Sequence, residues 1–86
     1  MKNMDYCYLL LPSVHDAMKA EKLLLQSGCA IQVIATPREI SHNCGVVIKF
    51  SCAEINTVLL SCKELSAEQK IFKKNSNNVY YEIIPE

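Results

Sequence analysis

Residues 6–28 read YCYLLLPSVHDAMKAEKLLLQSG, and this stretch predicts a strand, a short turn and a helix in direct succession. The aromatic and aliphatic run at its start ends at Pro12, which is typical of a strand over residues 5–11. Ser13 is a favoured N-cap, Asp16 suits a first helical turn, and Gly28 suits the end of a helix. The apolar residues between them lie on one broad arc of an amphipathic helix: Val14, Ala17, Met18, Ala20, Leu24 and Leu25.

Three further strands and a second helix are predicted from the rest of the chain. Short apolar runs indicate strands over residues 30–35 and 46–50, and a last strand over residues 79–84 follows the loop sequence NSNN. Ser51 and Glu54 form a capping-box pattern at the start of the second helix. Apolar residues at helical spacing follow it: Ile55, Val58, Leu59, Cys62 and Leu65. Residues 66–74 fit an extension of this helix, a third helix or an irregular segment.

The resulting order, β-α-β-β-α-β, predicts an α+β fold of the ferredoxin-like class, formed by a single domain over residues 1–86. Its usual form is a two-layer sandwich, in which an antiparallel sheet with strand order 4-1-3-2 carries both helices on one face. In that arrangement, the loop after the second strand lies at the sheet edge where the first helix begins.

The composition argues against several classes of function. Nine basic and nine acidic side chains leave no general electrostatic field for binding nucleic acid or an anionic membrane. No apolar run approaches the roughly 20 residues that span a bilayer, so we expect a cytoplasmic protein without a membrane partner.

The cysteines support the same expectation. Their number is odd, at five, and no C-x-x-C pair occurs, so neither a disulfide framework nor a metal site is expected, and no cofactor is implied. Four of them lie in apolar or helical contexts, where a thiol is usually a small core residue: Cys7, Cys29, Cys52 and Cys62.

The stretch ATPREISHNCG at residues 35–45 gathers charged and reactive side chains, and it holds the remaining cysteine, Cys44. The predicted topology brings this loop to the N-terminus of the first helix, near Ser13 and His15. A thiolate there would be stabilised by the partial positive charge of the helix end, with Arg38 or His42 in reach.

Two features of this loop leave its role open. Glu39 opposes a thiolate unless it pairs with Arg38 or carries a proton. A solvated polar turn with an incidental cysteine is the alternative to a reactive site.

The sequences YLLLPSVHDAMKAEKLL, TPREIS and CG together resemble the family of selenium/sulfur carrier-like proteins, over roughly residues 8–50. The resemblance implies that Cys44 is the carrier residue. It also implies a role for the residues that flank this cysteine in the family pattern: Thr36, Pro37, Arg38, Glu39, Ser41 and Gly45. The helix portion of the pattern is matched by His15, Asp16, Ala17, Glu21 and Lys22.

We therefore expect a carrier that holds a persulfide or selenosulfide on Cys44 and exchanges it with donor and acceptor proteins. It would not be a turnover enzyme with its own substrate pocket. A regulatory module that holds a small anion or ligand without covalent chemistry is the alternative, and an interaction protein with an inert thiol is a third.

A homodimer is predicted from the first strand. If Cys7, Leu9 and Leu11 face the helices, then Tyr6, Tyr8 and Leu10 face the other side of the sheet. An apolar face of this kind usually marks an interface, most simply with a second copy. The alternative is that the end of the chain folds over it.

Overall fold

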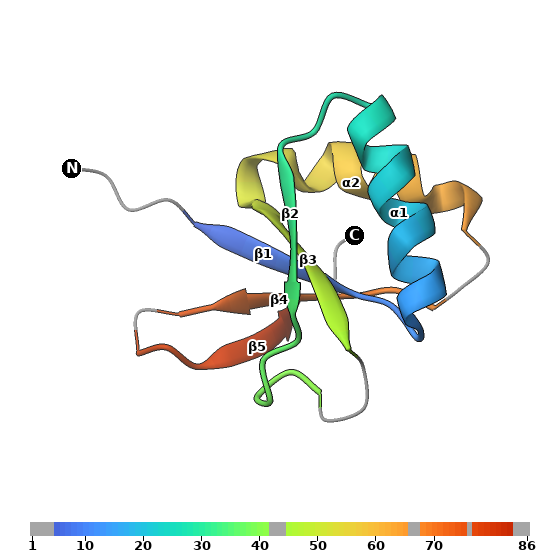
Figure 1. Ribbon diagram of the computed structural model, residues 1–86. Coiled ribbons are helices and arrows are strands. Elements are labelled where there is room, and N and C mark those ends of the chain that lie inside the picture. The colour runs from blue at the N-terminus through green and yellow to red at the C-terminus, as the bar shows by residue number, and fades with distance from the viewer. Residues whose placement is uncertain (1–4, 42–44, 66–67, 76, 84–86) are drawn as a thin grey trace.

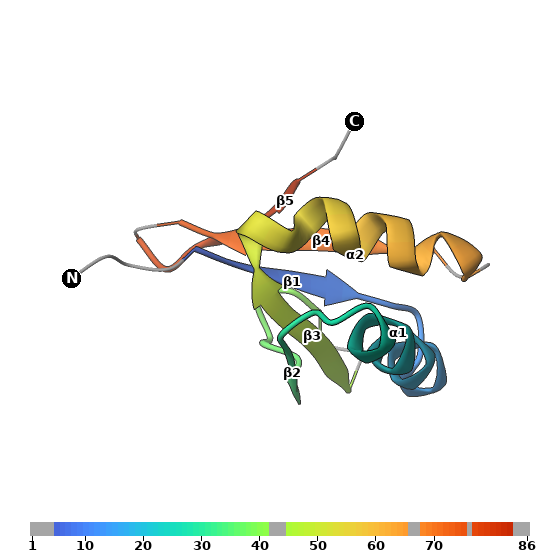
Figure 2. The ribbon, with the colours of Figure 1, turned by 90° about the horizontal axis from the view of Figure 1, so that it is seen from above.

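The computed structural model describes residues 5–41, 45–65, 68–75 and 77–83, which form one antiparallel sheet and two helices (Figure 1). The strands and helices are β1 (Tyr6–Leu10), α1 (Val14–Gln26), β2 (Ile31–Ala35), β3 (Val46–Ser51), α2 (Ile55–Ser61), β4 (Lys70–Lys74) and β5 (Tyr80–Ile83). Short 3-10 turns precede and follow α2: η1 (Cys52–Glu54) and η2 (Cys62–Glu64). Figure 2 shows α1 nearly end-on beside α2, and the two helices contact each other.

The sheet has five strands in the order β2-β3-β1-β4-β5, so the predicted ferredoxin-like sandwich with four strands in the order 4-1-3-2 is wrong. The predicted pairing of the first strand with the third, and of the third with the second, does occur. The difference lies beyond α2. There β4 occupies the place beside β1, and the last strand pairs with β4 at the edge of the sheet.

The extra strand β4 comes from the segment KIFKK, which the sequence left open between helix and irregular structure. Three of its five residues are lysines, so it lacks the apolar run by which a strand is normally recognised. Ile71 is the residue that enters the core, in register with Leu9 of β1.

The asparagine-rich loop that follows β4 closes a hairpin with β5. Asn75 N–H donates to Val79 O at 2.9 Å, and Asn78 adopts a left-handed φ of 63°, which asparagine tolerates well.

Helix α1 begins and ends as its sequence predicts. Ser13 Oγ accepts a hydrogen bond from Asp16 N–H at 3.1 Å, which is the N-cap interaction. After the helix, Gly28 has a φ of +82°, a conformation that favours glycine.

Helix α2 is shorter than predicted, and the capping box predicted at its N-terminus does not form. Ser51 Oγ accepts from Ala53 N–H at 3.3 Å. The Glu54 carboxylate instead accepts from Ala30 N–H at 3.3 Å, and so ties η1 to the residue before β2.

Both helices cover the same face of the sheet. One core cluster contains buried residues of both helices, of η2, of three strands, of the turn after β1 and of the loop before β2: Cys7, Leu9, Leu11, Ala17, Ala20, Leu24, Cys29, Ile48, Phe50, Val58, Cys62 and Ile71.

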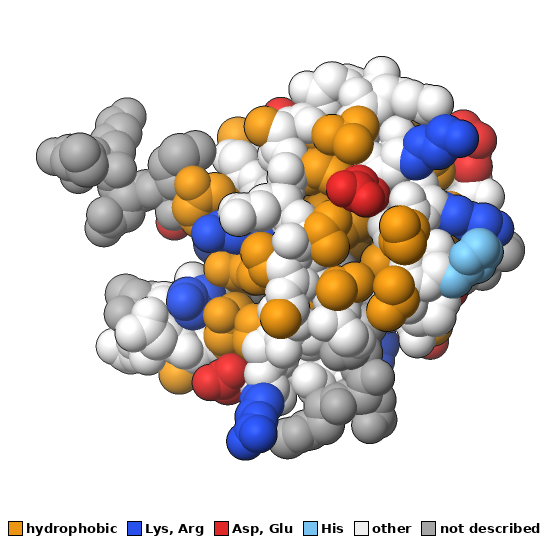
Figure 3. Space-filling view, viewed as in Figure 1, with side chains coloured by type: hydrophobic (Ala, Val, Ile, Leu, Met, Phe, Trp, Pro, Cys, Tyr) orange, Lys and Arg blue, Asp and Glu red, His pale blue; other side chains and the backbone are white. Residues whose placement is uncertain are grey.

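Only part of the predicted apolar arc of α1 faces this core. Exposed apolar side chains gather over α1 and β2 (Figure 3). They include a line of three along the helix, Val14, Met18 and Leu25, and Val33 on β2.

The opposite face of the sheet is partly covered by the chain itself. Tyr6, Tyr8 and Leu10 alternate with core residues of β1, so they lie on this face as predicted. However, Tyr8 is only 5% exposed, and its ring meets that of Tyr80 edge-on at a centroid separation of 5.3 Å. Lys49 Nζ lies 4.2 Å from the centroid of the Tyr6 ring. The C-terminal hairpin therefore contributes the cover that was the alternative to a homodimer.

Candidate functional site

The loop between β2 and β3 is held at its base by the end of the strand ladder. Ala35 and Val46 are the last paired residues, and Thr36 N–H then donates to Gly45 O at 3.2 Å. From Pro37 the chain forms a compact turn, because Pro37 O accepts from Ile40 N–H at 3.0 Å and from Ser41 N–H at 3.1 Å.

Arg38 and Glu39 occupy the tip of this turn and are exposed. Figure 1 shows the turn at the end of the sheet where β3 begins. This part of the predicted site is a polar turn at the surface.

The base of the loop reaches the first turn of α1. A Cβ atom added to Gly45 would lie 3.3 Å from Val14 Cγ2, which is tighter than an ordinary contact. A glycine at position 45 therefore lets the loop approach the helix closely. The predicted meeting of the loop and the start of α1 is found at Gly45.

The other predicted site residues are divided between structural roles and the surface. Ser13 Oγ is engaged as the N-cap, and it also donates to Asp16 Oδ2 at 2.9 Å. His15 lies on the exposed side of the same turn. His42 and Cys44 lie outside the described residues.

Thr36 has a buried hydroxyl oxygen, and nothing in the sequence predicted this burial. Its Oγ1 is inaccessible to solvent and has no hydrogen-bond partner among the described residues. A buried hydroxyl without a partner is uncommon and costs free energy, so its retention calls for an explanation. Thr36 lies opposite Gly45, so this hydroxyl belongs to the base of the loop that carries Cys44.

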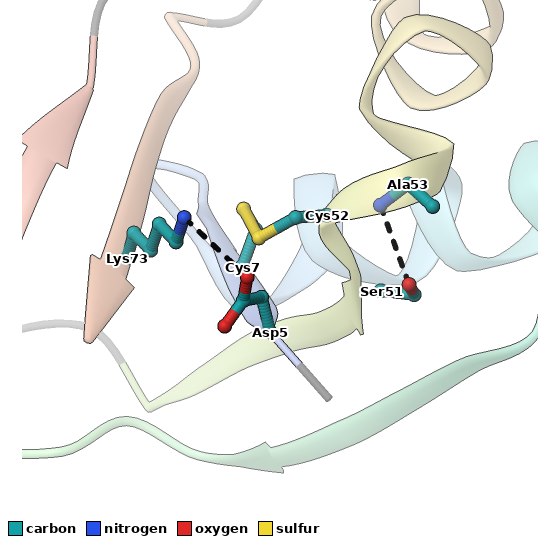
Figure 4. The surroundings of a disulfide bond; sticks show 6 residues. All are labelled: Asp5, Cys7, Ser51, Cys52, Ala53 and Lys73. Carbon is teal, nitrogen blue, oxygen red and sulfur yellow. Dashed lines mark hydrogen bonds and ion pairs between the residues drawn. A yellow bond between two sulfur atoms is a disulfide. The ribbon is translucent and has the colours of Figure 1, made fainter. Parts of the chain in front are cut away.

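Cys7 and Cys52 form a disulfide, which corrects the expectation, drawn from the number and spacing of the cysteines, of a chain without a disulfide framework (Figure 4). Their Cα atoms are 5.3 Å apart at a sequence separation of 45. Pairing of β1 with β3 sets Cys7 opposite Phe50, and Cys52 N–H donates to Asp5 O at 3.0 Å. The pairing of the first and third strands, which was predicted, is therefore what brings Cys7 and Cys52 together. No local spacing motif in the sequence indicates this disulfide.

Cys29 and Cys62 are free and buried, as their apolar contexts predict. Burial raises the pKa of the Cys62 thiol to about 11, and the neighbouring Cys29 adds to this effect. Burial also raises the pKa of Cys29, with a further contribution from the Glu54 carboxylate. Neither side chain presents a thiolate near neutral pH.

Among the described residues, no group of three or more histidine, cysteine, aspartate or glutamate side chains could hold a metal ion. Within the same part of the chain, no helix combines the length and the apolar character needed to cross a membrane.

Comparison with known proteins gives one positive result. The family model described as "Putative Se/S carrier protein-like" matches residues 6–84. Neither a curated protein nor a solved structure matches the chain. The match confirms the resemblance seen in residues 8–50 and extends it through β4 and β5. The chain belongs to the Se/S carrier protein-like family.

Proposed function

We propose that this protein carries sulfur or selenium as a persulfide or selenosulfide on Cys44 and passes it between a donor and an acceptor protein. The observation that carries the proposal is the state of the other four cysteines. Two are joined in a disulfide, and two are buried with raised pKa values. Cys44 is then the cysteine that remains to supply a thiolate.

The close approach of Gly45 to Val14 supports the proposal that Cys44, the residue before Gly45, acts near the N-terminus of α1. Consecutive Cα atoms are about 3.8 Å apart, so the approach of Gly45 to Val14 favours a Cys44 close to the first turn of α1. The N–H groups of a first helical turn have no partners within the helix and favour a negative charge. A thiolate and a persulfide anion would both gain from them.

We assign the Thr36 hydroxyl as a hydrogen-bond donor to the sulfur of Cys44. This role would satisfy the buried Oγ1, which has no partner within the described chain. Arg38 is exposed and is the cationic side chain among the described residues of the loop. We assign it the role of a counter-charge for the loaded sulfur. The binding role remains a prediction for the other residues named for it: His15, Glu39, Ser41 and His42.

The transfer step needs no oxidant or reductant. The Cys44 thiolate attacks the outer sulfur of a donor persulfide, a new sulfur–sulfur bond forms on Cys44, and the donor leaves as a thiolate. The proton of the donor persulfide moves with the transferred sulfur. Attack by an acceptor thiolate on that outer sulfur then regenerates the Cys44 thiolate.

Donor and acceptor proteins must reach the end of the molecule where α1 begins. There Val14 starts the exposed line that continues through Met18 and Leu25. The cytoplasmic location of this exchange remains a prediction. The homodimer through Tyr6, Tyr8 and Leu10 also remains a prediction. The disulfide does not support the cytoplasmic expectation, because disulfides persist mainly in oxidising compartments.

Alkylation tests whether Cys44 is the reactive thiol. Iodoacetamide should modify Cys44 first, at a pH below the free-thiol value of about 8.5. Cys29 and Cys62 should stay unmodified there, because burial raises their pKa values. The measurement is the extent of modification at each cysteine against pH, by peptide mass spectrometry. An ordinary titration profile for Cys44 would remove the basis for sulfur transfer and favour non-covalent anion binding.

Thr36→Val tests the assigned hydrogen bond. The substitution keeps the shape of the side chain and removes a hydroxyl that lacks a partner in the described residues, so the free energy of unfolding should fall by no more than the assigned hydrogen bond to Cys44 contributes. Alkylation of Cys44 at neutral pH should slow by about tenfold, the equivalent of about 1.4 kcal/mol for one hydrogen bond to a charged group. Thr57→Val, at an exposed position of α2, is the matched control. Loss of stability with unchanged alkylation would assign Thr36 a structural role instead.

A further inference from the structure

We propose that Cys7–Cys52 is a redox-active disulfide that exchanges with small monothiols of the glutathione class through the sulfur of Cys52. This inference concerns a second site and does not depend on Cys44. Gly45 precedes β3 and Cys52 follows it, and the six residues of the strand separate them by about 20 Å at the usual rise per residue. The two sites are therefore at opposite ends of one strand.

The two cysteines differ in exposure. Cys7 is fully buried, at 0% exposure, whereas Cys52 is partly exposed at the start of η1. Because Cys7 has no exposed surface and Cys52 has some, we expect a thiolate from solution to attack the Cys52 sulfur. Thiol–disulfide exchange depends on which sulfur is reached, so the mixed disulfide should form on Cys52.

A lysine is paired across the sheet with the cysteine whose sulfur must leave. Lys73 of β4 is in register with Cys7 and extends toward the disulfide and Asp5 (Figure 4). Its Nζ is 3.9 Å from Asp5 Oδ2, in an ion pair whose lysine side chain is 31% exposed. Burial disfavours a thiolate on Cys7, and a nearby cation opposes this effect by lowering the free energy of the thiolate, which makes it a better leaving group.

The exchange balances in two steps. A glutathione thiolate attacks the sulfur of Cys52, the Cys7–Cys52 bond breaks, and Cys7 leaves as a thiolate that Lys73 stabilises. A second glutathione thiolate then attacks the glutathione sulfur of the mixed disulfide, which releases oxidised glutathione and the Cys52 thiolate. The protein gains two electrons and, from solvent, two protons.

The test is a redox titration of the folded protein. Protein purified without reductant is equilibrated in mixtures of reduced and oxidised glutathione, quenched with acid, and analysed by differential alkylation and mass spectrometry. We expect the disulfide to open in the folded protein when reduced glutathione is in large excess over oxidised glutathione, with the glutathione adduct on Cys52. A disulfide that opens only after unfolding, or an adduct on Cys7, would overturn the proposal.

Matched charge variants separate a redox-active pair from a passive one. Lys73→Gln should slow the opening about threefold, and Asp5→Asn should accelerate it, because the carboxylate competes for the same ammonium. Lys70→Gln removes the same charge from the same strand at an exposed position facing the other side of the sheet, and should leave the rate unchanged. Equal rates for the Lys73 and Lys70 variants would contradict the role of the cation.

All rates are measured with Cys44→Ser as well as with the unmodified chain. Glutathione exchange at Cys52 in the Cys44→Ser variant would support this second site even if Cys44 carries nothing. Loss of exchange in both chains, with Cys44 still reactive, would overturn this inference and leave the carrier proposal intact.

Discussion

Removing the Cys7–Cys52 disulfide is expected to lower the free energy of unfolding by about 4 kcal/mol. The disulfide closes a loop across a sequence separation of 45, and the loop-entropy model gives about this value for such a length. For a domain of this size, that loss corresponds to a fall in melting temperature of roughly 15–30 °C. The disulfide should therefore be among the largest single contributions to stability.

The measurement is urea unfolding with and without a reductant, compared with the double variant Cys7→Ala/Cys52→Ala. The double variant should unfold at the same urea concentration as the reduced protein, and adding the reductant should not change its unfolding free energy. Equal unfolding free energies for the oxidised and reduced chains would contradict the prediction. They would show that the pair contributes little to the stability of the fold.

The elements that the sequence predicts well are those with local signals. Ser13 and Gly28 mark the ends of α1 because capping and a left-handed turn depend on the residues at those positions alone. The first three strands follow from short apolar runs, and their pairing follows from the order of the elements along the chain. The bounds of these elements need no information from distant residues.

The parts that were missed depend on contacts between distant segments. Strand β4 is stabilised by pairing with β1 on one side and β5 on the other, which overrides a lysine-rich sequence. Glu54 accepts from Ala30 instead of closing a capping box, because the start of β2 brings an unpaired N–H within reach. Tyr8 is buried although it lies on the face away from the helices, where Tyr80 from the added hairpin meets it.

The candidate site was predictable in its location and less so in its chemistry. The meeting of the loop base with α1 follows from the order of the first elements, and Gly45 against Val14 bears it out. The unpartnered Thr36 hydroxyl could not be foreseen, since burial of one side-chain atom depends on packing. Ser13, predicted near the site, is engaged in capping α1.

Replacing Cys44 by serine is expected to abolish loading with sulfur or selenium altogether. A serine hydroxyl does not ionise near neutral pH and cannot form the sulfur–sulfur bond. None of the four described cysteines offers an accessible thiolate in the oxidised protein, because Cys29 and Cys62 are buried and the other two are paired. Cys29→Ala is the matched control and should load as the unmodified chain does.

The most direct test is the mass of the protein after incubation with a persulfide donor, with the modified residue located by fragmentation. We predict the addition of one sulfur atom per chain on Cys44, and its loss when an acceptor thiol is added. An unchanged mass, or a sulfur atom held on a different cysteine with Cys44 unmodified, would contradict the proposal that this protein is a carrier acting through Cys44.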